Sequence, residues 1–154
     1  MSHSTSVSLL VRAPRAAVWR ALVDADAIAR WRVPDGMSCE VHEFDAREGG
    51  RFRISLTYSD PDAVGGKTDA HTDTYHGVFT TMRAEDQLVE TLEFESDDLA
   101  AGGTMVQTTT LSDSPGGTEV TIAHDGIPEA VSPADNEAGT RMALANLAAF
   151  VEGS

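Results

Sequence analysis

The feature that most constrains the fold is a series of short β-rich segments followed by one long helical segment. Six segments alternate in polarity or are rich in β-forming residues: residues 39–44, 51–58, 72–83, 87–95, 104–111 and 118–124. Short polar links between them predict an antiparallel sheet. The sheet needs a cover for its apolar face, and only the last segment, residues 133–152, is long enough to provide it, at about 30 Å as a helix.

The beginning of the chain predicts a further strand and two short helices. Residues 5–12, TSVSLLVR, form a strand-like run. Pro14 suits the first position of a helix, because its fixed φ is helical and its missing N–H is not needed there. Asp24 or Asp26 can cap a second helix that ends near Trp31. The order is therefore one strand, two short helices, six strands and one long helix.

The long helix carries its own start signals and one unusual residue. Ser132 is a natural N-cap, and Pro133 follows at the first helical position. Gly139 lies inside the helix, where glycine costs about 1 kcal/mol relative to alanine. It therefore predicts either a close approach by another backbone or space left for something else. In the loop DAREGG, Gly49 and Gly50 predict a hairpin turn with positive φ.

The composition is that of an ordinary soluble domain. With 154 residues and 41% hydrophobic residues, the chain is expected to form a single domain over 1–154, with its core over about 5–152. No apolar run approaches the roughly 18 residues of a membrane span, and no signal peptide is evident, so we expect no membrane insertion. The single cysteine, Cys39, fits a cytoplasmic location.

The net charge of −14 is unevenly distributed. Residues 84–154 hold 14 acidic side chains and one basic side chain, Arg141, whereas residues 1–83 are nearly neutral. Binding to nucleic acid requires cations that neutralise phosphates, so we expect no nucleic-acid partner. The acidic half is either a solvated surface or a docking face for a basic protein.

Five segments, in this order along the chain, resemble blocks of one protein family: AIARWRVPDGM, FDAREGGRFRISL, YHGVFTTMRAEDQLVETLEFES, GGTEVTIAHDGIP and EAGTRMALANLAAFV. They are similar to bacterial proteins related to the carboxyl-terminal domain of the activator of Hsp90 ATPase, within the START-like superfamily. The resemblance covers about residues 5–152. It implies an α+β helix-grip fold, with a curved antiparallel sheet of about seven strands and the terminal helix across its concave face.

The resemblance also implies functions, and the chain departs from it at one position. The superfamily includes lipid carriers, receptors and cyclases, so fold alone does not select a function. Members commonly carry tryptophan after the glycine of the last helix, where this chain has Thr140. The smaller side chain is expected to enlarge or reshape an internal pocket. The eukaryotic co-chaperone has a further amino-terminal domain for which this chain has no room, and this weakens an Hsp90 interpretation.

Several motifs suggest chemistry but lack its full pattern. HTDTYHG at 71–77 holds two histidines, yet in a strand they face opposite sides, so no metal site is expected. GGKT at 65–68 lacks the first glycine of a phosphate-binding loop, because position 61 is proline. Cys39 in an alternating strand is more typical of a small buried side chain than of a nucleophile. We expect no cofactor.

The sequence therefore predicts an internal, mainly apolar pocket that binds a small hydrophobic or amphipathic molecule. Its expected lining is Trp31, Phe52, Ile54, Tyr58, Tyr75, His76, Phe79, Thr91, Phe94, Leu144 and Leu147. Tyr58, Tyr75, His76 and Thr91 are the candidates for orienting polar groups. Packing of the core explains the large apolar side chains equally well, and the face on which Phe79 lies is left open.

Two other functions stay open. A cyclase or lyase could use an ionisable side chain in the same pocket, with His76, His124 and Glu93 as candidates. His124 could equally be a neutral histidine in a local hydrogen-bond pattern. A chaperone-associated module could bind Hsp90 or another protein through the acidic half. The sequence does not decide between a monomer and a homodimer.

Overall fold

The computed structural model describes residues 3–33, 36–58, 72–95, 103–129 and 131–153. Its elements follow the expected order: β1 (His3–Val11), α1 (Arg15–Leu22), α2 (Ala25–Trp31), β2 (Met37–Phe44), β3 (Arg51–Tyr58), β4 (Thr72–Arg83), β5 (Gln87–Phe94), β6 (Met105–Ser114), β7 (Gly117–Ile127) and α3 (Pro133–Glu152). The loop expected over 59–70, with its GGKT motif, and His71 lie outside the described residues.

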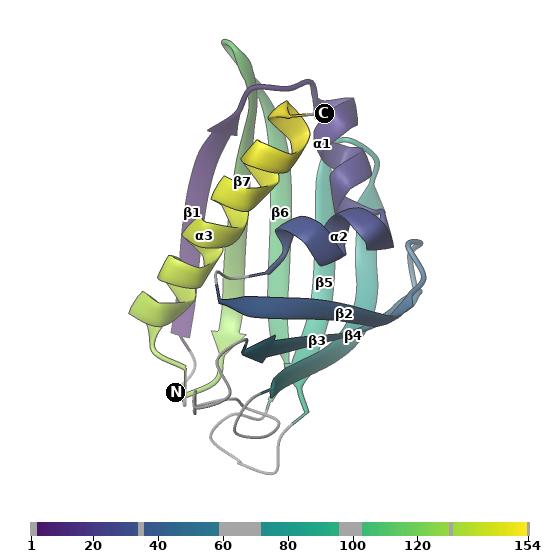
Figure 1. Cartoon of the computed structure of the whole chain (residues 1–154), viewed down its shortest axis with the longest axis vertical. Helices are drawn as coiled ribbons and strands as arrows, with labels where there is room; N and C mark the ends of the chain where they lie inside the picture. The colour runs from purple at the N-terminus through teal and green to yellow at the C-terminus, as the bar shows by residue number, and fades with distance from the viewer. Residues whose placement is uncertain (1–2, 34–35, 59–71, 96–102, 130, 154) are drawn as a thin grey trace.

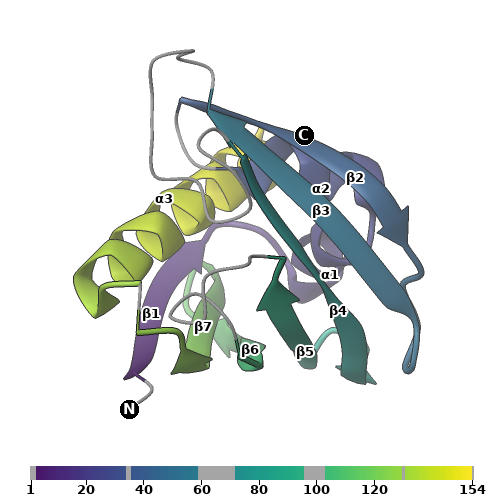
Figure 2. The ribbon, with the colours of Figure 1, turned by 90° about the horizontal axis from the view of Figure 1, so that it is seen from below.

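The described strands form one seven-stranded antiparallel sheet in the order β1-β7-β6-β5-β4-β3-β2. From β2 to β7 each strand pairs with its neighbour in sequence, while β1 pairs with β7. The sheet bends strongly, and α3 lies against its concave side with α1 and α2 (Figures 1 and 2). The expected helix-grip architecture is confirmed.

Alternation along each strand separates an inner from an outer face. In β5, Leu88, Glu90 and Leu92 are buried, whereas the residues between them, Val89 and Thr91, are partly exposed to solvent. In β3, Phe52 and Ile54 are buried, as the sequence predicts. The inner face therefore carries the core, but it also holds buried polar side chains, among them Glu90.

The short helices are fixed by one cap and one buried hydrogen bond. Asp24 caps α2 by accepting from the backbone N–H of Asp26. Pro14 precedes α1 as its N-cap residue, one position earlier than expected. The indole N–H of Trp31 donates to the carbonyl of Ala21 at 2.8 Å, which ties the end of α2 to α1 and satisfies a buried polar atom.

The long helix begins as predicted. The Ser132 hydroxyl accepts from the N–H of Asp135, and Pro133 is the first helical residue. A Cβ added at Gly139 would meet nothing within 4 Å. The expectation of a close backbone approach at Gly139 is therefore wrong, and the alternative of open space beside it is confirmed.

Two other glycines are required by their surroundings. Gly49 has the expected positive φ, at 83°. Gly50 does not, and instead allows the carbonyl of Asp45 to approach, because a Cβ there would lie 2.0 Å from that oxygen. The prediction of positive φ at both positions is therefore right only for Gly49.

Candidate functional site

A row of five residues runs along the concave face over five adjacent strands, from β1 at one edge of the sheet to β4. The register pairs Phe79 with Glu90, Glu90 with Gln107, Gln107 with His124, and His124 with Thr5. All five are buried, and four of them are polar. A polar row on an inner face is uncommon, because buried polar groups require partners.

Arg32, the residue after α2, supplies the charge that this row needs. Its Nη1 donates to Glu90 Oε1 at 2.8 Å, and its Nη2 donates to Gln107 Oε1 at 3.1 Å. Glu90 is 1% exposed, and the Arg32 side chain is 12% exposed. The buried carboxylate also accepts from Gln107 Nε2 at 2.9 Å. Burial acts to lower the pKa of Arg32, but the combined effects of Glu90, Tyr75 and Cys39 exceed it, and the net shift is upward.

His124 extends the polar row toward β1. Its Nε2 lies 2.8 Å from Gln107 Oε1, whereas its buried Nδ1 has no hydrogen-bond partner among the described residues. Burial, and to a lesser extent the positive charge of Arg32, together lower the pKa of His124 to about 4. His124 is therefore neutral at neutral pH. We call Arg32, Glu90, Gln107 and His124 the inner polar cluster.

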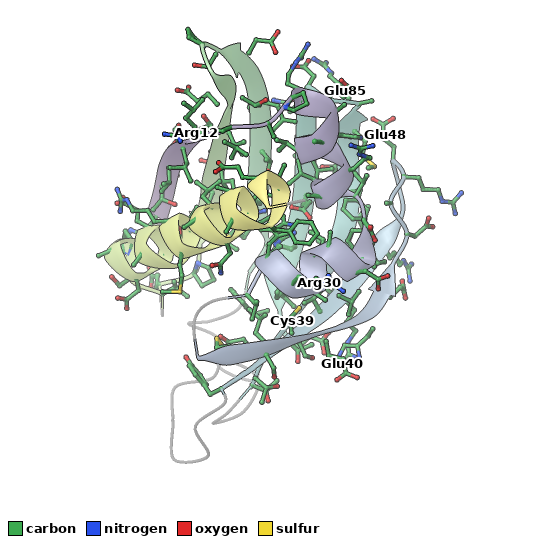
Figure 3. The ribbon with its side chains drawn as sticks, turned by 45° about the horizontal axis from the view of Figure 1, so that its top comes forward. Arg12, Arg30, Cys39, Glu40, Glu48 and Glu85 are labelled. Atoms are coloured by element: carbon green, nitrogen blue, oxygen red, sulfur yellow. The ribbon has the colours of Figure 1, made fainter. Side chains whose placement is uncertain are left out.

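Aromatic and sulfur-containing side chains border the cluster on its other side. The Arg32 guanidinium lies 5.6 Å from the centre of the Tyr75 ring, a cation–π arrangement. Burial raises the pKa of Tyr75 to about 12. Burial also raises the pKa of Cys39, against the opposing effect of Arg32. Cys39 lies on the side of β2 that faces α2, whereas Glu40 lies on the other side (Figure 3).

Small polar residues of α3 cover the β1 end of the row. The hydroxyl of Thr5, the cross-strand neighbour of His124, donates to Asn136 Oδ1. One turn further along α3, the buried Thr140 donates to the carbonyl of Asn136. Thr140 therefore lies over this end of the sheet, at the position where members of the resembling family commonly carry tryptophan.

Six of the predicted lining residues lie in closely packed core. Each of them is at most 2% exposed: Trp31, Phe52, Ile54, Phe79, Leu144 and Leu147. A side chain that lines a space wide enough for water keeps accessible surface, so these six pack against protein atoms. The Phe79 ring, for example, lies 5.0 Å from that of Phe52 and 5.3 Å from that of Phe44. We call this region the packed half of the interior.

Inner-face side chains are less covered by other protein atoms at the ends of β3 and β5, and we call this region the open half. There β3 ends at Tyr58 and β5 ends at Phe94, and both side chains are only partly buried. By the alternation of each strand, Tyr58 faces the same side as the buried Ile54, and Phe94 faces the same side as the buried Leu92. The Phe94 ring lies 6.2 Å from that of Tyr75, edge to face. The structure thus brings Tyr75 and Phe94 together beside the inner polar cluster.

His76 and Thr91 do not reach the interior. His76 alternates with the buried Tyr75, and its ring nitrogens lie 3.1 Å from Glu93 and 2.9 Å from Glu95 on the outer face. Thr91 lies between the buried Glu90 and Leu92, so it also faces outward. Both therefore leave the candidate site, because a strand cannot turn adjacent residues to the same face.

The surface also carries a shallow depression between α3 and the start of β2. Its volume is about 520 Å³, and it is open to solvent. The lining residues are Arg30, Val33, Gly36, Met37, Asn146, Ala149 and Phe150. Asn146 of α3 donates to the carbonyl of Val33 at 2.8 Å, which holds the α2–β2 connection against α3.

Within the described ranges, no group of three or more His, Cys, Asp or Glu side chains is arranged to hold a metal ion. In the same part of the chain, none of the helices combines the length and apolar character of a membrane span.

The sequence pointed to His124 but not to the other three members of the inner polar cluster. Glu90 carried a usable signal, because in QLVETLEF it occupies the position in the alternation held by Leu88 and Leu92. Gln107 follows the same rule in β6. Arg32 carried no such signal, since it follows a helix and its direction depends on the tertiary fold.

Comparison with known proteins agrees with this architecture. The sequence profile described as "Activator of Hsp90 ATPase homolog 1-like protein" matches residues 12–152. A crystal structure of a Chromobacterium violaceum protein is 27% identical, with a TM-score of 0.85 over 97% of this chain and 98% of that chain. A solution structure of an AHSA1-like protein from Aeromonas hydrophila is 24% identical, with a TM-score of 0.74 over 98% of this chain and 93% of that one.

More distant structures show the fold alone. A Rhodobacter sphaeroides protein is 19% identical, with a TM-score of 0.80 over 97% of this chain and 92% of that chain. Among curated proteins, none matches the chain. The family profile covers most of the sequence, and the element order and concave-face helix agree with it. The chain therefore belongs to the family of Activator of Hsp90 ATPase homolog 1-like proteins.

Proposed function

We propose that the protein binds a small amphipathic molecule in the open half of the interior, between the sheet and the first half of α3. The observation that carries the proposal is the incomplete cover over inner-face aromatic side chains beside a buried polar cluster. Tyr58 and Phe94 are partly buried, and Tyr75 connects Phe94 to Arg32. Binding sites for small molecules combine apolar walls with a few fixed polar groups in this way.

Thr140 and Gly139 support the same location. Neither residue fills space as a tryptophan would, and the position of a Cβ on Gly139 is open. Burial of an apolar ligand surface stabilises the complex by roughly 25 cal/mol per Å² before the losses of binding entropy. The packed half offers no comparable surface, because its side chains are already covered.

Titration with N-phenyl-1-naphthylamine, an uncharged fluorescent probe, tests the proposal. We expect saturable binding by the unmodified protein and its loss in Thr140→Trp, where the indole occupies the proposed space. Ala145→Trp is the matched control, because Ala145 lies on the exposed face of the same helix. It should bind the probe as the unmodified protein does.

The outcomes are distinct. Absence of saturable binding by the unmodified protein contradicts the proposal, and so does undiminished binding by a folded Thr140→Trp variant. Thr140→Leu provides a milder replacement if the tryptophan variant melts at a much lower temperature. Native mass spectrometry of freshly purified protein gives an independent measurement, since a bound small molecule adds a discrete mass.

The enzymatic alternative keeps only one of its three candidate residues. Glu93 is 48% exposed and lies with His76 on the outer face, so neither faces the proposed ligand space. His124 does face inward, but a pKa of about 4 makes it a weak base at neutral pH. Binding without chemistry is therefore favoured over a cyclase or lyase. Binding to Hsp90 stays a prediction.

A further inference from the structure

The directions of the hydrogen bonds in the inner polar cluster are fixed by chemistry. The Glu90 carboxylate, paired with Arg32, only accepts hydrogen bonds, so the atom of Gln107 that approaches it must be the amide nitrogen. The amide oxygen of Gln107 then faces Arg32 and His124. If the Gln107 amide were reversed, its NH2 group would face the N–H groups of Arg32, and two hydrogen-bond donors would meet.

This orientation determines the tautomer of His124. Because Gln107 Oε1 is an acceptor, His124 Nε2 must carry the proton and donate. The ring is neutral, as its lowered pKa of about 4 requires, so Nδ1 carries a lone pair and no proton. His124 is 7% exposed, and Nδ1 accepts no hydrogen bond from the residues that the structure describes.

The cluster is also balanced in charge. One buried cation, Arg32, faces one buried anion, Glu90, and the neighbouring Gln107 and His124 are neutral. A ligand carboxylate placed here would lie close to the negative charge of Glu90, while the Arg32 guanidinium is already paired with Glu90. Desolvating such an anion without a free counterion is strongly unfavourable.

We propose that the ligand is an uncharged hydrophobic molecule carrying a hydroxyl group, and that this hydroxyl donates its hydrogen bond to His124 Nδ1. The inference rests on the proposed function and specifies its ligand class. The apolar part of the molecule lies against Tyr75 and Phe94 in the open half. An alcohol or phenol satisfies the buried acceptor, whereas an ether or a carboxylate offers it no proton.

Three probes with the same apolar body separate the outcomes: 4-pentylphenol, 4-pentylanisole and 4-pentylbenzoate. We expect the phenol to bind the unmodified protein about tenfold more tightly than the anisole, because the ether leaves the buried acceptor unsatisfied. The benzoate should bind most weakly. In His124→Phe, the affinities for the phenol and the anisole should agree within about twofold, because an aromatic ring remains at this position but the Nδ1 acceptor is absent.

His42→Phe is the matched control. His42 contacts Ser55 in an exposed pair, so its replacement should keep the preference for the phenol. If His124→Phe does not fold, the unmodified protein still gives an answer by long-range ¹H–¹⁵N NMR. The His124 Nδ1 resonance should be that of an unprotonated nitrogen, and it should move on addition of the phenol but not of the anisole.

The two proposals fail in different ways. If neither the three probes nor N-phenyl-1-naphthylamine binds the unmodified protein, the proposed function fails. If the probes bind with equal affinity for phenol and anisole, or with the benzoate tightest, the proposed function survives and the hydroxyl inference is overturned. A phenol preference that persists in His124→Phe, or a protonated Nδ1, also overturns it.

Discussion

The two halves of the interior are built from the same strands but by different rules. In the packed half, Phe52 and Phe79 are at most 1% exposed and meet ring to ring. Next to it, the same face of the sheet carries the inner polar cluster, and the open half adjoins this cluster with the partly buried aromatic side chains of Tyr58 and Phe94. The packed half is stabilised by apolar contact, whereas the cluster adds little net stability and requires every partner to stay in place. Such an arrangement is better explained by specificity than by stability.

The largest effect is expected where the cluster loses its cation. Arg32→Met leaves the Glu90 carboxylate buried without a counterion and should lower the free energy of unfolding by about 3–5 kcal/mol. Chemical denaturation measures the change. The double variant Arg32→Met/Glu90→Leu should recover most of the loss, because no buried charge remains.

A surface ion pair provides the control for this substitution. Arg47 pairs with Asp45 at 2.8 Å, but both side chains are well exposed. Arg47→Met should change the free energy of unfolding by less than about 1 kcal/mol. Equal effects of Arg32→Met and Arg47→Met would contradict the buried character of the cluster.

Truncation of one phenylalanine in each half compares their packing directly. Phe79→Ala should lower the free energy of unfolding by about 3–4 kcal/mol, because Phe79 is fully buried among other rings. Phe94→Ala should cost less than about 2 kcal/mol, since that side chain is only partly buried. Thermal and urea unfolding give both values. A cost for Phe94→Ala as large as that for Phe79→Ala would mean that the open half is closed.

Acid should destabilise the fold through His124. Its pKa is about 6.5 in the unfolded chain and about 4 in the folded protein, so between these values the unfolded state binds more protons. Stability is therefore fully present above about pH 6.5 and is lost as the pH falls toward 4, by about 2 kcal/mol between pH 7 and pH 5. His124→Gln should remove this part of the pH dependence in urea unfolding.

A second group with a lowered pKa acts in a different pH range. Hydrogen bonding from Arg53 lowers the pKa of Glu95 to about 2, so its contribution is lost only below about pH 4.5. A pH 7 to pH 5 slope that is the same in His124→Gln and in the unmodified protein would refute the assignment to His124.

The smallest effect is expected on the outer face. His76→Gln should change the free energy of unfolding by less than about 1 kcal/mol, because its contacts with Glu93 and Glu95 lie on the outer face and are partly exposed to solvent. Binding of N-phenyl-1-naphthylamine should not change. A loss of probe binding in this variant would place His76 in the site after all.

The sequence predicted the elements well because their signals are local. Each of these signals depends on a few neighbouring residues: the β-rich runs 51–58 and 72–83, the N-cap at Ser132 and the first helical residue, Pro133. The site was predicted less well. Large apolar residues such as Phe52 look the same whether they line a pocket or fill a core, and only accessible surface separates the two. The position of Arg32 depends on the packing of α2 against the sheet, which no local pattern encodes.

The pairing of β1 with β7 fixes an order of events during synthesis. Thr5 and His124 are register partners although most of the chain separates them, and α3 contributes the next contact through Asn136. On the ribosome, β1 emerges before the other described strands and has no sheet neighbour until β7 has been translated. The hairpins from β2 to β7 carry no such requirement, because each of these strands pairs with the next one along the chain.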